Sequence, residues 1–183
     1  MSLVSQIQAK GRTPGFAPRF LVAMAAVVVV LYLALGAFWR PALGGLAAAR
    51  LHAPDLTVWN GLSPAIKVHV LFAVAALVLG AVLMLVRKGR TFHRVAGWTW
   101  VAVVAVVAGS TLFITSLNHG SWSVLHLFTG WTLITLPIAV IAARRHEIAR
   151  HRGRMMGLFY GGFAINLFVA FIPGRALWQM FFG

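Results

Sequence analysis

The sequence predicts an all-α integral membrane protein with five membrane-spanning helices, in which the last four spans form a four-helix bundle core. Three observations lead to this prediction: 61% of the 183 residues are hydrophobic, only 10% are charged, and the hydrophobic residues occur in long runs. A soluble domain carries about a quarter charged residues. A run of roughly 20 apolar residues can cross about 30 Å of hydrocarbon as a helix.

Five such runs are expected to form one transmembrane domain over residues 1–183. They cover about residues 20–38, 66–86, 95–114, 124–143 and 155–172. The first run is longer than the core of about 7 to 15 residues of a cleaved signal peptide. We therefore expect it to remain as an N-terminal anchor helix beside the bundle of the other four.

Basic residues predict the orientation of these spans. They concentrate in "RKGRTFHR", after the second run, and in "RRHEIARHRGR", after the fourth. Because basic loops stay in the cytoplasm, the N-terminus is expected inside and the C-terminus outside. This arrangement predicts a multi-pass protein of the bacterial inner (cytoplasmic) membrane whose main partner is the lipid bilayer. It also explains the formal net charge of +14 without nucleic-acid binding.

The scarcity of acids and the lack of cysteine exclude several kinds of chemistry. Asp55 and Glu147 are the only acidic residues, and both lie outside the predicted spans. No carboxylate is therefore available within the membrane for a proton relay or an ion site. Without cysteine the chain has no thiolate nucleophile, disulfide or sulfur ligand for a metal.

The four bundle spans contain an internal repeat. The stretch "VHVLFAVAALVLGAVLMLVRKGRTFHRVAG" begins at Val68, and "LHLFTGWTLITLPIAVIAARRHEIARHRGRM" begins at Leu125. Each starts with a histidine between apolar residues, crosses the membrane, passes a basic loop and reaches a second His-Arg pair. The two histidines are separated by 24 residues in the first unit and by 25 in the second. Spans two and three are therefore predicted to be duplicated as spans four and five, related by an axis along the membrane normal.

This repeat groups four histidines into two pairs. His69 and His126 are expected in the first turns of helices that enter from outside, and His93 and His151 at the inner ends of the returning helices. Each pair comes from two different helices at one depth, which is the arrangement that bis-histidine haem ligation needs. We therefore predict two haem b groups, with these four histidines as iron ligands. A copper or zinc site fits less well, because each pair provides only two ligands.

Small residues one helical turn after three of the four histidines are consistent with a bound porphyrin, while Met155 takes this position after His151. Gly97 follows His93 and Gly130 follows His126 by four residues, so each lies on the same helix face as its histidine. Ala73 has the same relation to His69. A missing side chain there would leave space for the edge of a porphyrin.

Cations near each pair could neutralise the haem propionates, which need cationic or hydrogen-bonding partners near lipid. The candidates are Arg94 and Arg152 for the inner pair and Lys67 for the outer pair. The positive-inside rule alone also explains the two arginines.

Two short motifs carry a family resemblance. The stretches "FHRVAGW" and "HRGRMMGLFYGG", with "IKVHVLF" and "VLHLFTG", resemble a bacterial family of predicted membrane proteins of unknown function, DUF2306, over roughly Ile66 to Gly162. That resemblance implies no activity. The pairing of helix two with four and three with five is also similar to the cytochrome b561 architecture, which implies one haem near each membrane face.

Two functions follow from these patterns. The first is a di-haem b-type cytochrome, a transmembrane oxidoreductase that carries electrons between a quinone or small reductant and an acceptor. The alternative is a cofactor-free accessory subunit or small-molecule carrier, in which the interfacial histidines are structural. No catalytic residue and no oligomeric state is indicated by the sequence.

Overall fold

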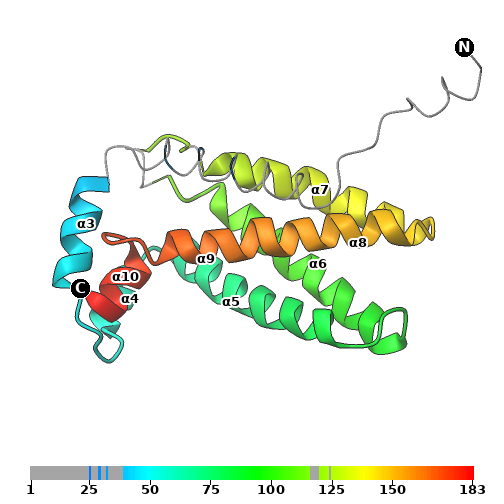
Figure 1. Cartoon of the computed structure of the whole chain (residues 1–183), viewed down its shortest axis with the longest axis horizontal. Helices are drawn as coiled ribbons and strands as arrows, with labels where there is room; N and C mark the ends of the chain where they lie inside the picture. The colour runs from blue at the N-terminus through cyan, green and yellow to red at the C-terminus, as the bar shows by residue number, and fades with distance from the viewer. Residues whose placement is uncertain (1–24, 26–28, 30–31, 33–38, 116–119, 124) are drawn as a thin grey trace, which may run out of the picture. The chain divides into compact units, whose positions relative to one another are not determined.

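The computed structural model describes residues 25, 29, 32, 39–115, 120–123 and 125–183 (Figure 1). The chain divides into two compact units, Met1–Ala37 and Phe38–Gly183. The second unit holds nearly all described residues, and the description below concerns it alone. The predicted anchor helix at 20–38 lies almost entirely outside the described residues, so that helix and the single domain remain predictions. No strand occurs among the described residues, as expected for an all-α protein.

Three helices of the described part are long and apolar enough to cross a membrane, which supports the integral membrane assignment. They are α5 (Pro64–Leu85), α6 (Thr91–Thr111) and α7 (His126–Arg144). Each lies within a few residues of a predicted span. Ser63 caps α5 by accepting a hydrogen bond from the backbone N–H of Ile66, and Pro64 occupies the first turn, where its missing N–H costs nothing.

The predicted fifth span is divided into three consecutive elements. A helical run passes from α8 (Ile148–Gly157) through the π-helix η3 (Leu158–Ala164) into α9 (Ile165–Ala170). No single element of this run is long enough to be counted as a span, so the prediction of five spans is not confirmed. The helix also begins at Ile148 rather than at 155, because hydropathy marks the hydrocarbon crossing and misses the polar turns before it.

The segment between the first two predicted spans, residues 39–65, contains two helices that hydropathy did not predict. These are α3 (Trp39–Ala48) and α4 (Leu56–Gly61), and a third short helix, α10 (Ala176–Phe182), ends the chain. Backbone hydrogen bonds connect residues before α4 to α10: His52 N donates to Phe181 O at 3.0 Å, and Asp55 N donates to Met180 O at 2.9 Å. These bonds join segments that are far apart in the sequence.

The centre of the bundle is held by a buried tryptophan. Trp100 of α6 donates its Nε1–H to the carbonyl of Ala76 in α5 at 2.8 Å. Gly80 allows this close approach, since a Cβ there would lie 2.6 Å from the Phe159 ring and 2.8 Å from Trp100 Nε1. The core around this contact includes the buried side chains of Val104, Leu136 and Leu158. It positions α5, α6, α7 and η3 relative to one another.

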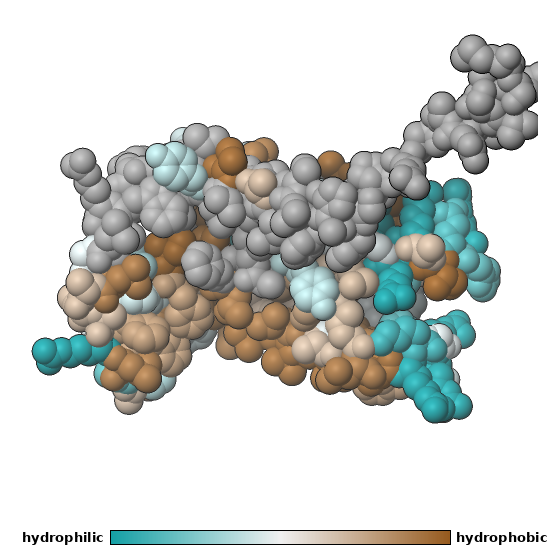
Figure 2. Space-filling model, in the orientation of Figure 1, coloured by the Kyte–Doolittle hydropathy of each residue, from teal (hydrophilic) through white to brown (hydrophobic). Residues whose placement is uncertain are grey.

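The surface separates apolar helix sides from one polar end. Figure 2 shows hydrophobic residues along the helices and hydrophilic residues gathered where α5 turns into α6 and α7 turns into α8. We call the end formed by residues 86–90 and 145–147 the basic end. The other end, where α6 leads toward α7 and where α4 and α10 lie, is called the opposite end (Figure 1).

Candidate functional site

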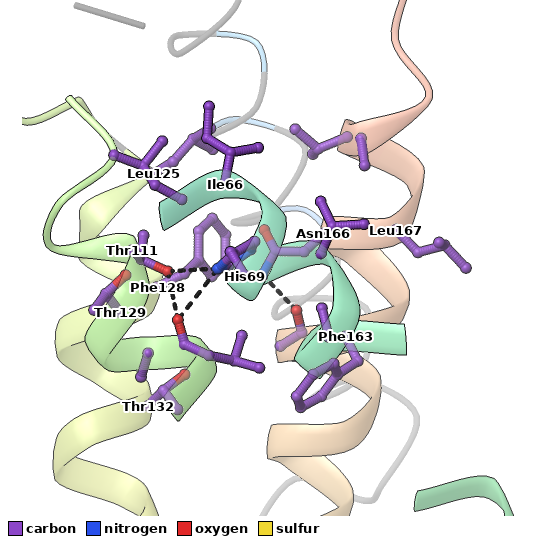
Figure 3. Close-up of a pocket in the computed structure, with 18 of the residues that line it drawn as sticks. Ile66, His69, Thr111, Leu125, Phe128, Thr129, Thr132, Phe163, Asn166 and Leu167 are labelled. Atoms are coloured by element: carbon purple, nitrogen blue, oxygen red, sulfur yellow. Dashed lines mark hydrogen bonds between the residues drawn. The ribbon is translucent and has the colours of Figure 1, made fainter. Parts of the chain in front are cut away.

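A cavity of about 290 Å³ lies among α5, α6, α7 and the η3–α9 segment at the opposite end (Figure 3). Its wall is mostly apolar, and it includes both His69 and His126. The structure thus brings these two predicted ligands to one space. The other polar wall residues are Thr111, Ser123, Thr129, Thr132, Asn166 and Arg175. A mostly apolar space with a few convergent polar groups is typical of a ligand site.

His69 is held by the C-terminal part of α6. Its Nδ1 lies 3.2 Å from the carbonyl of Val107 and 3.2 Å from both Ser110 Oγ and Thr111 Oγ1. Both hydroxyls donate their own hydrogens to the Val107 carbonyl, at 2.8 and 2.9 Å. Because the Val107 carbonyl can only accept, the ring proton is on Nδ1 and the lone pair is on Nε2, with both hydroxyl oxygens close to the same N–H. That is the tautomer of a histidine ligand oriented by a backbone carbonyl.

His126 has the other tautomer. Its Nδ1 accepts a hydrogen bond from the backbone N–H of Ser123 at 3.1 Å, so the proton is on Nε2, which donates to the Thr111 carbonyl at 3.1 Å. The ring also stacks on Trp122, with the centroids 5.6 Å apart and the planes 10° apart. Both nitrogens of His126 are therefore engaged, and a metal could bind Nε2 only after the bond to Thr111 is released.

The basic end brings together the other two histidines. His151 of α8 donates its Nδ1–H to the carbonyl of Ala139 in α7 at 3.0 Å, which leaves Nε2 as the free lone pair. His93 of α6 lies close enough for a charge on His151 to act on it. Its Nδ1 is buried and has no hydrogen-bond partner in the described part of the chain. A buried, unpartnered ring nitrogen is uncommon and is often explained by a missing ligand or ion.

The small residues next to the histidines leave open space. A Cβ added at Gly97 or Gly130 would meet no atom within 4 Å, and Ala73 lines the cavity at the opposite end. No neighbouring side chain therefore fills the space next to Gly97 or Gly130, whereas His151 is followed one turn later by the larger Met155.

The predicted cations are placed differently from one another. Arg94 and Arg152 are exposed at the basic end, near His93 and His151 in sequence. Lys67 is turned toward α4, because its Nζ donates to the carbonyl of Asn60 at 3.0 Å. Among the described residues, no group of three or more His, Cys, Asp or Glu side chains is arranged to hold a metal ion.

Arg175 is a cavity residue that the sequence reasoning missed. It is half-buried at the N-cap position just before α10, and burial lowers the pKa of its guanidinium from its ordinary value. Its segment follows the last apolar run, on the side where basic residues are not expected. An arginine that departs from the positive-inside pattern was the signal that could have identified it.

Comparisons with known proteins place the chain in a family. The model described as "Predicted membrane protein (DUF2306)" matches residues 66–180, which run from the first turn of α5 into α10 and include both histidine pairs. No curated protein and no solved structure matches the chain. The similarity to cytochrome b561 remains a prediction. Because the matched region covers more than half of the sequence, the chain belongs to the DUF2306 family of predicted membrane proteins.

Proposed function

We propose that the protein is a di-haem b-type cytochrome of the bacterial inner membrane, built on five spans with the N-terminus inside. It would carry electrons across the membrane between a quinone or small reductant and an acceptor. The observation that carries this proposal is the basic-end pair: the Ala139 carbonyl orients His151 so that its Nε2 is free, and His93, which lies near it, has no hydrogen bond at Nδ1 among the described residues that would have to be exchanged. The second pair, His69 of α5 and His126 of α7, lies at the opposite end of the bundle, on the two helices that do not carry the first pair.

The basic-end residues fit a haem without rearranging a hydrogen bond. The Ala139 carbonyl holds His151 so that Nε2 is available, and the imidazole of His93 comes from a different helix. Gly97, one turn after His93, leaves space for a flat ring. Arg94 and Arg152 would neutralise the propionates at the membrane surface.

The opposite-end histidines could ligate a haem after one exchange, with one edge of its ring in the cavity of about 290 Å³. His69 presents Nε2 with its Nδ1 anchored on α6, while His126 must give up its bond to the Thr111 carbonyl before it can coordinate iron. Breaking such a hydrogen bond costs about 0.5–1.5 kcal/mol. We therefore expect the opposite-end haem to bind more weakly than the basic-end haem.

A bound haem supplies one-electron oxidation and reduction, and the chain supplies its position and surroundings. If the histidine pair at each end binds a haem, electrons could cross without an ionisable side chain in the hydrocarbon. The reductant would be oxidised by one electron at one face, and the acceptor reduced by one electron at the other. Asn166 and the threonines of the cavity wall could donate hydrogen bonds to a quinone carbonyl.

The test is an absorption spectrum of the detergent-purified protein from haem-supplied cells, oxidised and then reduced with dithionite. Pyridine haemochrome measurement should give about two haem groups per chain, each with a low-spin b-type reduced spectrum. Substituting His93→Ala should remove about one of them, and Arg144→Gln, which changes an exposed arginine outside both sites, should remove none. A colourless wild-type protein would overturn the proposal.

One observation favours the alternative of a cofactor-free accessory subunit or carrier. Both ring nitrogens of His126 already have partners, as a structural histidine requires. In that case His126→Ala would lower the thermal stability of the protein, and purified wild-type protein would bind no haem on titration. Haem binding that is lost in His126→Ala while stability is retained would exclude this alternative.

A further inference from the structure

We infer that the opposite-end cavity binds the carboxylate of an amphipathic ligand and that Arg175 is the residue that binds it. This inference extends the proposed function, since the haem propionates are one source of such a carboxylate. The inference does not require haem, because a free long-chain acid also combines an apolar body with a carboxylate. In both cases an apolar body would occupy the space among α5, α6, α7 and α9, and the acid group would meet the guanidinium.

Arg175 is a cation without an acidic partner. The chain has only two acidic side chains: Glu147 pairs with Arg150 at 3.0 Å, and Asp55 accepts two hydrogen bonds from Thr57. The guanidinium of Arg175 makes no hydrogen bond or ion pair with another described residue. A half-buried charge that lines a cavity and has no partner is costly unless a ligand or solvent compensates it.

The backbone holds Arg175 in place independently of its side chain. Its N–H donates to the carbonyl of Ile172 at 3.0 Å, and Gly174 before it has a φ of 89°, which a glycine adopts without strain. Its own carbonyl accepts from Gln179 N at 2.9 Å in α10. A substitution that changes only the side chain of Arg175 therefore keeps this turn.

The other cavity residues define the rest of the ligand. Apolar residues such as Val70, Val104 and Phe163 form most of the wall. A volume of about 290 Å³ is at the lower end of small-molecule sites, so it would take a slender body or one edge of a larger ring. The planar guanidinium matches a planar carboxylate and balances one negative charge.

The first arm of the test uses haem, in a His93→Ala background that leaves only the opposite-end site. Haem b and its dimethyl ester, in which both propionates are esterified, are titrated into the protein. We expect haem to bind about 10- to 100-fold more tightly than the ester, and we expect Arg175→Gln to abolish this preference. Arg144→Gln removes an equal charge outside the cavity and should leave the preference unchanged.

The second arm does not depend on haem. Wild-type protein and Arg175→Gln are titrated with a fluorescently labelled undecanoic acid and with the matching alcohol. A preference for the acid that disappears in Arg175→Gln supports a free amphiphile as the ligand. Arg175→Lys, which keeps the charge but not the planar fork, should retain part of the preference.

The two arms separate this inference from the proposed function. If no haem binds, the proposed function fails, and the second arm alone decides whether Arg175 binds a carboxylate. A preference for the free acid that depends on Arg175 in either arm supports the inference. If neither arm shows such a preference, the inference is wrong, whether or not the protein binds haem.

Discussion

The two ends of the helical bundle carry histidines at almost the same sequence spacing but hold them in different ways. At the opposite end, Thr111 contacts both rings, because its hydroxyl meets His69 and its carbonyl accepts from His126. At the basic end, His151 bonds to a carbonyl of another helix, and His93 has a buried nitrogen without a partner in the described part of the chain. Histidines at equal sequence spacing therefore differ in the hydrogen bonds of their ring nitrogens.

This difference indicates which pair is prepared for a ligand. The Nε2 of His126 must exchange its hydrogen bond to Thr111 before it can bind iron, while the Nε2 of His151 is already free. The opposite end also carries additional structure, since α4 and α10 are joined there by backbone hydrogen bonds. We therefore expect substitutions at the basic end to change mainly ligand binding, and substitutions at the opposite end to change mainly the stability of the fold.

The largest expected effect distinguishes the two ends by replacing one histidine at each. His93→Leu should remove about one haem per chain, but it should leave the haem-free protein as stable as before or more stable by about 1 kcal/mol, because a buried unsatisfied nitrogen is lost. His126→Leu breaks the bonds to Ser123 and Thr111 and should destabilise the haem-free protein by about 1–3 kcal/mol. Thermal unfolding in detergent and haem quantification measure both effects. A larger loss of stability in His93→Leu would reverse the assignment of the two ends.

A glycine in the middle of the bundle should affect both ends equally. In Gly80→Ala the new Cβ would lie 2.6 Å from Phe159 and 2.8 Å from Trp100 Nε1, so we expect a loss of about 1–3 kcal/mol. Gly97→Ala is the matched control, because its Cβ meets nothing within 4 Å and alanine favours a helix by roughly 0.5–1 kcal/mol. Unfolding of the haem-free variants tests both. If Gly97→Ala also lowers haem content at the basic end alone, the space beside it belongs to the ligand.

A smaller effect should be confined to the opposite end. Thr111→Val removes the hydroxyl near His69 and its bond to the Val107 carbonyl, at a cost of about 0.5–1.5 kcal/mol. Thr99→Val is the control on the same helix, because the exposed Thr99 bonds only to the Val95 carbonyl, and its effect should stay within about 0.5 kcal/mol. Binding of the labelled acid should change in Thr111→Val but not in Thr99→Val. Equal changes in both variants would place Thr111 outside the site.

Hydropathy predicted α5, α6 and α7 well because a membrane helix must satisfy its own backbone, so a long apolar run leaves few alternatives. It missed α3 and α4, since α4 has only six residues and depends on the Asp55 cap and on bonds to α10, which lies far along the sequence. The division of the last run by η3 also has no signal in composition, because a π-helix depends on local packing.

The histidines themselves could be selected from the repeat, but their hydrogen bonds could not. The carbonyls that orient His69 and His151 belong to Val107 and Ala139 on neighbouring helices, and spacing along one helix does not predict them. The position of Arg175 at the cavity could not be predicted from the sequence either. Arg175 stands alone in the sequence after the last run, and only the return of α9 toward α5 places it at the cavity.

The smallest expected effect concerns the additional structure of the opposite end. Hydrogen bonds from Thr57, first from its hydroxyl and then from its backbone N–H, lower the pKa of Asp55 from the ordinary value of 3.8. Because the folded-state pKa is lowered, the stabilisation of α4 is complete above 3.8 and is lost as the pH falls through the lowered value. Hydrogen exchange at the Thr57 amide should therefore accelerate in acid, while exchange near the Trp100 core stays constant. Asp55→Asn, which still caps the helix, should remove this pH dependence, because the amide does not titrate in that range. If acid accelerated exchange equally at both places, Asp55 would not be a local cap, and the opposite end would unfold together with the bundle core.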